Sequence, residues 1–352
     1  MEKFIKEIDD INLSCISQAG YKSAYIGELH QYNRNGLLLA NGFVVTTAAY
    51  KNFISYNDLE NQLIITLNDL RLNDAIDFEK ISLRAKQMIM QSEMPADLGM
   101  AIIGAYDYMC DLAEQPVCVS TSFTFEMPFD NTDKTIETNL NVQGHCALLY
   151  AVRKCFANLF SISALHHIAL NKVDIGSLDV AVCIQKMIRA DKACAGAGLT
   201  TDLSFKDENV MHITGSWGLG NRTVGLDNEN DEYWIFKPSL AGKMSLLEMK
   251  LGAKTKMLMV AKEDDYSLQT IETKTPGGIQ HRYVLNLKEI EGLGKCGLLI
   301  EQHFKKPMLF RWAKDGLNNQ IYILSIHPED TRPKLPINDL SKTSDFYGEV
   351  AK

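Results

Sequence analysis

The most informative stretch of this chain is a strand-turn-strand pattern near its end, PMLFRWA (307–313), KDGLNN (314–319) and QIYILSIH (320–327). The outer segments are rich in aromatic and aliphatic residues, which favour strands. Asp315-Gly316 and Asn318-Asn319 in the middle segment are typical of a tight turn. The pattern therefore predicts a β-hairpin.

The two faces of this hairpin differ in chemistry. Successive side chains of a strand point to opposite faces, so the first strand presents two sets of residues. The sets are Leu309, Arg311 and Ala313 on one face, and Met308, Phe310 and Trp312 on the other. On the second strand, Ser325 and His327 share a face. We expect the face that carries Arg311 to be turned inward, toward the rest of the protein.

Outward from the hairpin, the second half of the chain favours short strands, and the first half favours helices. We expect strands at 178–187, 210–216, 233–238 and 256–260. In the first half we expect helices at 1–29, 46–54, 57–112 and 146–170, strands at 37–45 and 116–124, and a polar loop at 125–138. Thr47 is the expected N-cap of the helix at 46–54.

These elements predict an α+β protein with two lobes. We expect an N-terminal lobe of helices and strands over 1–190, a β-rich C-terminal lobe over 191–332, and a cleft between them. The residues after this, 333–352, are expected to form a polar tail.

Composition excludes several functional classes. The 352 residues include 36 Lys and Arg and 44 Asp and Glu, so the formal net charge is −8. An acidic chain is a poor nucleic-acid binder, and we expect neither a nucleic-acid nor a membrane partner, no signal peptide and no membrane-spanning helix. The eight cysteines form no Cys-x-x-Cys pair, which indicates reduced thiols and a cytoplasmic location. The adjacent His166 and His167 are expected to pack or to lie at the surface rather than to bind metal.

A series of motifs is similar to those of one enzyme family. The segment GYKSAYIGEL (20–29) resembles the Gly-Gly-Lys-(x)3-Leu-Gly-Glu-Met opening of the phosphoenolpyruvate synthase and pyruvate phosphate dikinase family. NGFVVTT (41–47) resembles that family's Pro-x-Gly-Phe-x-x-Thr segment. Further matches follow in the same order at 140–142, 184–191, 195–202, 217–220, 231–238 and 312–316.

This resemblance implies an ATP-grasp-like nucleotide-binding unit. Full-length members of the family carry two more modules, a domain with a phosphorylated histidine and a barrel that binds pyruvate. We expect neither module here, so completing that reaction would need a protein partner with a phosphohistidine or a pyruvate-binding domain.

The resemblance also implies a nucleotide site. It places the phosphate-binding lysine at Lys22, for which the alternative is a solvated helix lysine. It places the adenine-contacting hinge, where backbone groups matter most, at Gln185, Lys186, Met187 and Ile188. The implied cofactor is ATP or another nucleotide.

Other positions depart from the family pattern. The phosphate arginine is Ser120, the glycine-rich phosphate loop reads Asn131 to Thr135 around Lys134, and the glutamate after Gly-Leu-Gly is Asn221. Glu126 keeps one acidic position. On the hairpin, the family's Asp and Glu near magnesium are Leu309 and Arg311, and its Gln and Arg are Ser325 and His327.

These departures argue against magnesium. The family's two carboxylates at these positions carry a charge of −2. Leu309 is neutral and Arg311 is positive, so the charge of the two residues here is +1. A guanidinium about 4 Å from a divalent ion opposes it by roughly 8 kcal/mol at an effective dielectric constant near 20. We therefore expect no metal site here. Arg311 either pairs with a carboxylate such as Glu301 or, with His327, replaces the metal and meets an anion directly.

Three functions remain open from the sequence. The first is a catalytically degenerate nucleotide-binding domain, a pseudoenzyme with a binding or regulatory role. The second is an active ATP-dependent phosphotransferase that acts on a histidine of a separate protein. The third is a structural interaction module with an empty cleft. Whether the chain is an enzyme stays open, as do its ligand, partner, pathway and oligomeric state.

Overall fold

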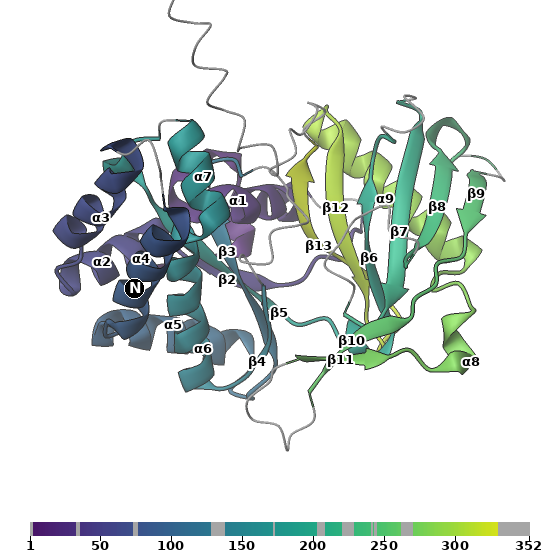
Figure 1. Cartoon of the computed structure of the whole chain (residues 1–352). Helices are drawn as coiled ribbons and strands as arrows, with labels where there is room; N and C mark the ends of the chain where they lie inside the picture. The colour runs from purple at the N-terminus through teal and green to yellow at the C-terminus, as the bar shows by residue number, and fades with distance from the viewer. Residues whose placement is uncertain are drawn as a thin grey trace, which may run out of the picture.

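A computed structural model describes residues 3–32, 36–72, 77–127, 138–171, 173–202, 208–219, 229–240, 242, 245–261 and 270–329. The predicted site residues Lys134 and Asn221 and the tail at 333–352 lie outside these ranges. The described residues build two large antiparallel sheets, each with its own helices, and these lie side by side in Figure 1.

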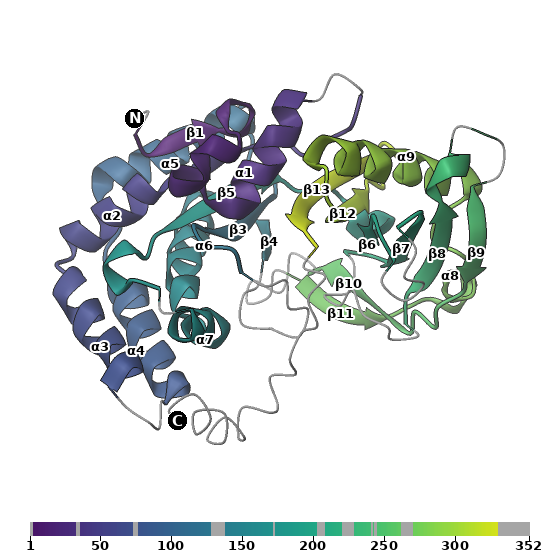
Figure 2. The ribbon, with the colours of Figure 1, turned by 90° about the horizontal axis from the view of Figure 1, so that it is seen from above.

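The first sheet has five strands in the order β1-β2-β5-β3-β4. Their bounds are β1 Ile5–Glu7, β2 Gly42–Val45, β3 Val117–Phe123, β4 Asn139–Val142 and β5 Val180–Lys186. One face packs on helices α2 Thr47–Tyr56, α3 Glu60–Leu72, α4 Phe78–Gln91, α5 Ala96–Met109, α6 His145–Ala157 and α7 Ile162–Leu170. Helix α1 Ile16–Tyr32 covers the other face, where Ala19 and Ala24 pack on Val44 and Ala181 (Figure 2).

The second sheet has six strands in the order β13-β12-β6-β7-β8-β9. Their bounds are β6 Cys194–Leu199, β7 Val210–Trp217, β8 Asp231–Phe236, β9 Leu246–Lys250, β12 Met308–Lys314 and β13 Ile321–Pro328. Helix α9 Leu287–Phe304 packs on one face, against Met308, Phe310 and Trp312. A separate pair of strands, β10 Lys256–Val260 and β11 Thr270–Lys274, is followed by the short helix α8 Gly277–Gln280.

Short 3-10 helices complete the described structure, at Ile8–Asp10, Leu13–Cys15, Asn158–Phe160, Ile175–Ser177, Ala190–Lys192 and Lys237–Ser239. The turn at Ala190–Lys192 lies between β5, the last strand of the first sheet, and β6, the first strand of the second.

Helix α1 joins the two halves of the molecule. Its residues Tyr25, Ile26 and Leu29 belong to the same apolar core as α9, β12 and β13. At the edge of this contact, Glu28 lies 3.1 Å from His303 and the Lys306 ammonium donates to the Tyr25 hydroxyl at 2.8 Å. The N-terminal helix therefore holds the second sheet as well as the first.

Most predicted elements form, including the α+β composition, the hairpin and the helices over 57–112. The helix predicted over 1–29 is wrong in its first half, which forms β1 and two 3-10 turns before α1 begins at Ile16. The strand predicted over 37–45 shortens to Gly42–Val45. Thr46, not Thr47, is the N-cap of α2, and the Thr47 hydroxyl donates to the Ser17 carbonyl instead.

Among the described residues, one segment, His145–Leu170, is long and apolar enough to cross a membrane by length and composition. It contradicts our expectation that no stretch reaches that length. However, it is two helices separated by a 3-10 turn, and 67% of its apolar window is buried, as in a core helix.

The rings of His166 and His167 stack on Phe78 and Phe125, which confirms their packing role. All eight cysteines are free.

Candidate nucleotide site

Gly20 gives the start of α1 its shape. Its φ of +71° and ψ of 167° interrupt the helix in a region open to glycine but strained for other residues. A Cβ at this position would lie 2.2 Å from the backbone oxygen of Ser122, so a side chain has no room. The Ser23 amide then donates to the Ser122 hydroxyl at 3.0 Å. The kink therefore brings the first turns of the helix directly onto β3.

Lys22 follows this kink and points at β3. Its ammonium donates to the Ser120 hydroxyl at 2.6 Å, and that hydroxyl donates in turn to the Cys183 carbonyl at 3.4 Å. Burial, and to a smaller degree the positive charge of Arg311, lowers the pKa of Lys22. Within the described part of the chain no carboxylate pairs with this ammonium. Lys22 is thus a partly buried cation on a neutral partner, not a solvated helix lysine.

The hairpin brings its polar face to the same place. Leu309 lies opposite His327 and Arg311 opposite Ser325, so these four residues share a face, as strand alternation predicts. Burial, followed by the charges of Lys22 and Arg311, lowers the pKa of His327 to about 3, so its imidazole is neutral at pH 7. Helix α1 also packs on β13, and the charges of Lys22 and Arg311 are felt at His327.

The structure does not favour the predicted ion pair between Arg311 and Glu301. Both oxygens of Glu301 accept from the Lys237 ammonium, at 2.9 and 2.7 Å. The hydroxyls of Thr200 and Thr201 add weaker bonds at 3.3 Å. Glu301 therefore holds the ends of β6 and β8 together, away from the polar face of the hairpin.

The predicted hinge connects the two sheets. The Gln185 side chain donates to the carbonyls of Ala40 and Leu324, at 3.4 and 3.3 Å. The amides of Lys186 and Met187 donate to the Asn41 and Pro116 carbonyls, at 2.9 and 3.1 Å. A base bound at this hinge must therefore use its other backbone groups.

Beside the hinge lies a small apolar cluster that the sequence analysis did not identify. Three alanines, Ala190, Ala195 and Ala313, form its buried centre, and Ile188, Leu219 and Leu324 pack around them. Ala313 and Arg311 share one face of β12, two residues or about 7 Å apart along the strand. The cluster can therefore contact a flat, apolar ring whose charged substituent reaches Arg311.

Sequence alternation could not place Leu324 in this cluster. Arg311 pairs with Ser325, but Trp312 pairs with Ile323, so Leu324 is the extra residue of a β-bulge. A bulge shifts the two-residue period by one, and its position depends on the partner strand rather than on local sequence. Ile188, by contrast, is one of the four residues that the sequence resemblance places at the hinge.

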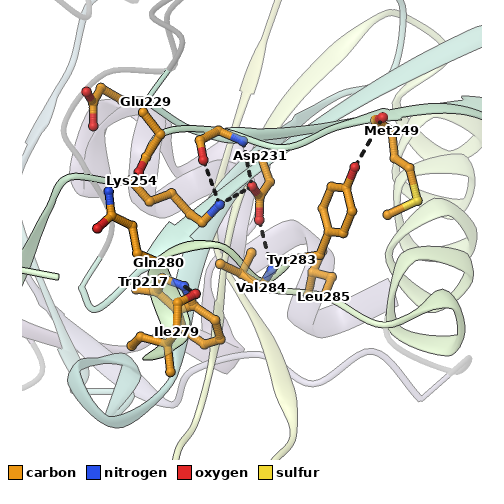
Figure 3. A network of polar contacts seen from close by, with 12 residues as sticks. Trp217, Glu229, Asp231, Met249, Lys254, Ile279, Gln280, Tyr283, Val284 and Leu285 are labelled. Carbon is orange, nitrogen blue, oxygen red and sulfur yellow. Dashed lines mark hydrogen bonds and ion pairs between the residues drawn. The ribbon is translucent and has the colours of Figure 1, made fainter. Parts of the chain in front are cut away.

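A buried ion pair joins the start of β8 to the segment before β10 (Figure 3). The Asp231 carboxylate accepts from the Lys254 ammonium and from the amides of Gly252 and Val284, both at 2.8 Å. Asp231 and Lys254 are fully buried. Because its oxygens are occupied by donors, this carboxylate is structural. It anchors the segment that leads into β10, whose Leu258 carbonyl accepts from the Leu219 amide at 2.9 Å.

The side chains present at the hairpin do not fit magnesium, which prefers hard anionic oxygen ligands. The shared face offers an apolar Leu309, a guanidinium, a hydroxyl and an imidazole. Over the residues that the structure describes, no group of three or more His, Cys, Asp or Glu could hold a metal ion. The chemistry of this donor set suits an anion better than a cation.

Comparisons with known proteins identify the family of this chain. The model of the family "Pyruvate phosphate dikinase, AMP/ATP-binding domain" matches residues 16–344. The phosphoenolpyruvate synthase of Aquifex aeolicus is 32% identical over 337 residues, 92% of this chain and 39% of that protein. The phosphoenolpyruvate synthase of Helicobacter pylori is 31% identical, over 93% of this chain and 41% of that protein.

A similar match extends to an archaeal relative. The probable phosphoenolpyruvate synthase of Methanothermobacter thermautotrophicus is 30% identical over 94% of this chain and 46% of that protein. The chain spans about two fifths of the length of the first two relatives. The family match confirms the resemblance and the ATP-grasp-like α+β fold. The chain belongs to the pyruvate phosphate dikinase AMP/ATP-binding domain family, and it is a phosphoenolpyruvate synthase-like nucleotide-binding domain.

Proposed function

We propose that this chain binds an adenine nucleotide at the contact between its two sheets and does not transfer phosphate efficiently. The observation that carries this proposal is the shared hairpin face of Leu309, Arg311, Ser325 and His327, which offers no carboxylate for a metal among its own residues. Phosphoryl transfer depends on positioning and on neutralising charge that develops on the phosphate, usually with magnesium. A site that binds without that metal is suited to binding rather than turnover.

The arrangement of the site supports a nucleotide over a simple anion. The cluster of Ile188, Leu324 and Ala313 gives an apolar surface for a base, and Arg311 lies two residues further along β12 for the phosphates. The hinge backbone next to Ile188 supplies polar groups at the edge of that surface. Base and phosphate subsites therefore follow one another along β12.

The biological role would then be binding or regulation, in the cytoplasm, where the free thiols stay reduced. Its partner would be a protein with a phosphohistidine or a pyruvate-binding domain, since the relatives matched over this region are named phosphoenolpyruvate synthases. Binding of a nucleotide would change the stability of this domain and so its contact with the partner.

The test combines nucleotide titration with turnover. Thermal unfolding is followed with ATP, ADP and AMP, each with magnesium and with EDTA, and ATP hydrolysis is measured in parallel. Ligand at 100 times its dissociation constant adds about 2.7 kcal/mol to the free energy of unfolding. We expect stabilisation without turnover. Magnesium-dependent turnover would favour the active phosphotransferase, and no stabilisation by any nucleotide would favour the structural module.

A further inference from the structure

Helix α5 carries an apolar stripe on its exposed side. Met100 is 67% exposed, Tyr108 is 79% exposed, and Gly104 lies exposed between them. Residues four apart in a helix lie on one face, so these three form a row about 12 Å long. Leu112, which is 85% exposed, lies in the turn after the helix, where its amide donates to the Asp107 carbonyl at 2.8 Å. Three large apolar side chains are thus exposed to solvent along one helix and its closing turn.

The other side of α5 is anchored in the core of the first half. Leu98, Ile102 and Tyr106 are buried there with residues of α6 and of the first sheet. At the end of the helix, the Asp107 carboxylate lies 2.8 Å from the imidazole of His145, the first residue of α6. In Figures 1 and 2, α5 lies with the first sheet and away from the second. The stripe is therefore presented by a well-packed helix, away from the candidate nucleotide site.

The surroundings of the stripe are negatively charged. Between Lys86 and Lys134 the sequence contains no Lys or Arg. Within that span, α5 and the segments beside it contain five carboxylates, at Glu93, Asp97, Asp107, Asp111 and Glu114. All of them are exposed except Asp107, which is partly buried. On the helix surface, Asp97 neighbours Met100 and Asp107 neighbours Gly104, because residues three apart are adjacent.

This charge decides which occupant fits the stripe. A symmetric contact between two copies of the chain would set these carboxylates against one another, and like charges across an interface are unfavourable. An anionic lipid surface would be repelled for the same reason. A partner that suits this face has positive charge around its own apolar residues.

The shape of the stripe favours a helix as the partner. Rows of residues four apart are the ridges that pack into the grooves of a neighbouring helix. The row on α5 has a gap in its middle, because Gly104 has no side chain and a Cβ there would meet no atom within 4 Å. Glycine in a helix costs about 0.5–1 kcal/mol relative to alanine, and it allows another backbone to approach closely. Tyr and Met, which flank the gap, are enriched in protein interfaces.

We infer that the exposed side of α5 docks a basic amphipathic helix of another protein. An apolar residue of that helix sits over Gly104, between Met100 and Tyr108, and its Lys or Arg residues face the carboxylates around the stripe. Attraction between exposed charges is screened by salt, so the affinity falls as ionic strength rises. This interface goes beyond the proposed function, because it uses no residue of the candidate nucleotide site.

The experiment measures binding of two synthetic amphipathic helices to the full chain by fluorescence anisotropy, in low salt and in about 0.3 M sodium chloride. Both peptides have the same row of leucines, and the remaining positions are lysine in one and glutamate in the other. The test variant is Met100→Lys. The matched control is Leu83→Lys, because Leu83 is 61% exposed on α4, beside the basic Arg84. Thermal unfolding checks that both variants fold.

We expect the lysine peptide to bind the wild-type chain roughly tenfold more tightly than the glutamate peptide, and to bind less tightly in high salt. Met100→Lys should weaken its binding by about fivefold or more, and Leu83→Lys by less than about twofold. Equal binding of the two peptides, or an equal loss in the two variants, would overturn the inference.

Two further measurements test the other occupants. Self-association of the wild-type chain in sedimentation, abolished by Met100→Lys, would assign this face to a second copy and overturn the inference. Binding to vesicles of anionic phospholipid, abolished by the same variant, would assign the face to a membrane and also overturn it. A wild-type chain that neither self-associates nor binds the vesicles, together with the expected peptide binding, would support it.

Discussion

The Lys22 ammonium donates a hydrogen bond to the Ser120 hydroxyl across 2.6 Å, and this contact joins the start of α1 to β3. A partly buried cation therefore depends on a neutral partner, beside the second positive charge of Arg311. Partial burial removes some of the favourable hydration free energy of the Lys22 ammonium, and its neutral partner does not provide an ion pair in return. This loss of hydration free energy is consistent with a lysine that binds a ligand rather than one that stabilises the fold.

Replacing Lys22 tests this relationship. Lys22→Met keeps the length of the side chain and removes the charge. We expect the free energy of unfolding without ligand to stay within about 1 kcal/mol of wild type or to rise, because repulsion by Arg311 is relieved and apolar burial is gained. Nucleotide affinity should fall at least tenfold. Urea denaturation and titration measure the two effects.

The matched control for Lys22→Met is Lys295→Met, on the exposed side of α9. It should change the free energy of unfolding by no more than about 0.5 kcal/mol and leave affinity unchanged. A loss of several kcal/mol in Lys22→Met alone would show that the hydrogen bond to Ser120 is structural, contrary to the proposal.

The partly buried imidazole of His327 predicts acid sensitivity. Burial and the charges of Lys22 on α1 and Arg311 on β12 lower its pKa to about 3 in the folded state, against about 6.5 in the unfolded chain. Below pH 6.5 the His327 imidazole is therefore protonated in the unfolded chain but stays neutral in the folded protein. The free energy of unfolding consequently falls as the pH is lowered toward about 3. At pH 5 this one group lowers the free energy of unfolding by about 2 kcal/mol relative to pH 7.

Urea denaturation at pH 7 and pH 5 measures this effect in wild type and in His327→Gln. The variant should lose less stability between the two pH values, by about 2 kcal/mol. His281→Gln, at an exposed position, serves as the control and should follow wild type. Equal acid sensitivity of all three proteins would refute the assignment.

Gly20 should tolerate no side chain. Gly20→Ala puts a Cβ 2.2 Å from the Ser122 backbone oxygen, in a conformation that only glycine adopts without strain. We expect a loss of about 3 kcal/mol or more in the free energy of unfolding, together with weaker nucleotide binding because Lys22 is displaced. Thermal and urea unfolding measure the loss.

A second glycine gives the comparison for this prediction. Gly104 lies within α5, and a Cβ there meets no atom within 4 Å. Gly104→Ala should therefore stabilise the protein by about 0.5–1 kcal/mol, because alanine loses less backbone entropy in a helix. Similar effects at both glycines would argue against the role given to Gly20.

The ion pair in Figure 3 predicts that removing one partner lowers the free energy of unfolding strongly, and that removing the second partner as well restores part of it. Asp231→Asn leaves the fully buried Lys254 ammonium without its counter-charge, which costs about 3–5 kcal/mol. Adding Lys254→Met should recover part of that loss, because the double variant buries no charge. Comparing the two single variants with the double variant by urea denaturation gives the coupling between the residues. A coupling near zero would contradict the pairing.

Much of the fold was readable from local patterns. The turn chemistry of Asp315-Gly316 and the alternation of Phe310, Arg311 and Trp312 are properties of a few neighbouring residues, so the hairpin and its two faces were predictable. Helix α9 also has a local signal in its sequence, since Asn286 and Glu289 form a capping box at its start. The helical spacing before Ile16 does not produce a helix, because β1 pairs with β2 there.

The chemistry of the site has a different origin. The ordered motifs and the residue types at Lys22, Ser120 and Arg311 were sufficient for the family and for the argument against magnesium. The neutral partner of Lys22, the depressed pKa of His327 and the inclusion of Leu324 beside the hinge depend on packing between segments that are far apart in the sequence, as Lys22 and His327 are. Charge interactions and β-bulges are set by neighbours in space, which no local sequence pattern specifies.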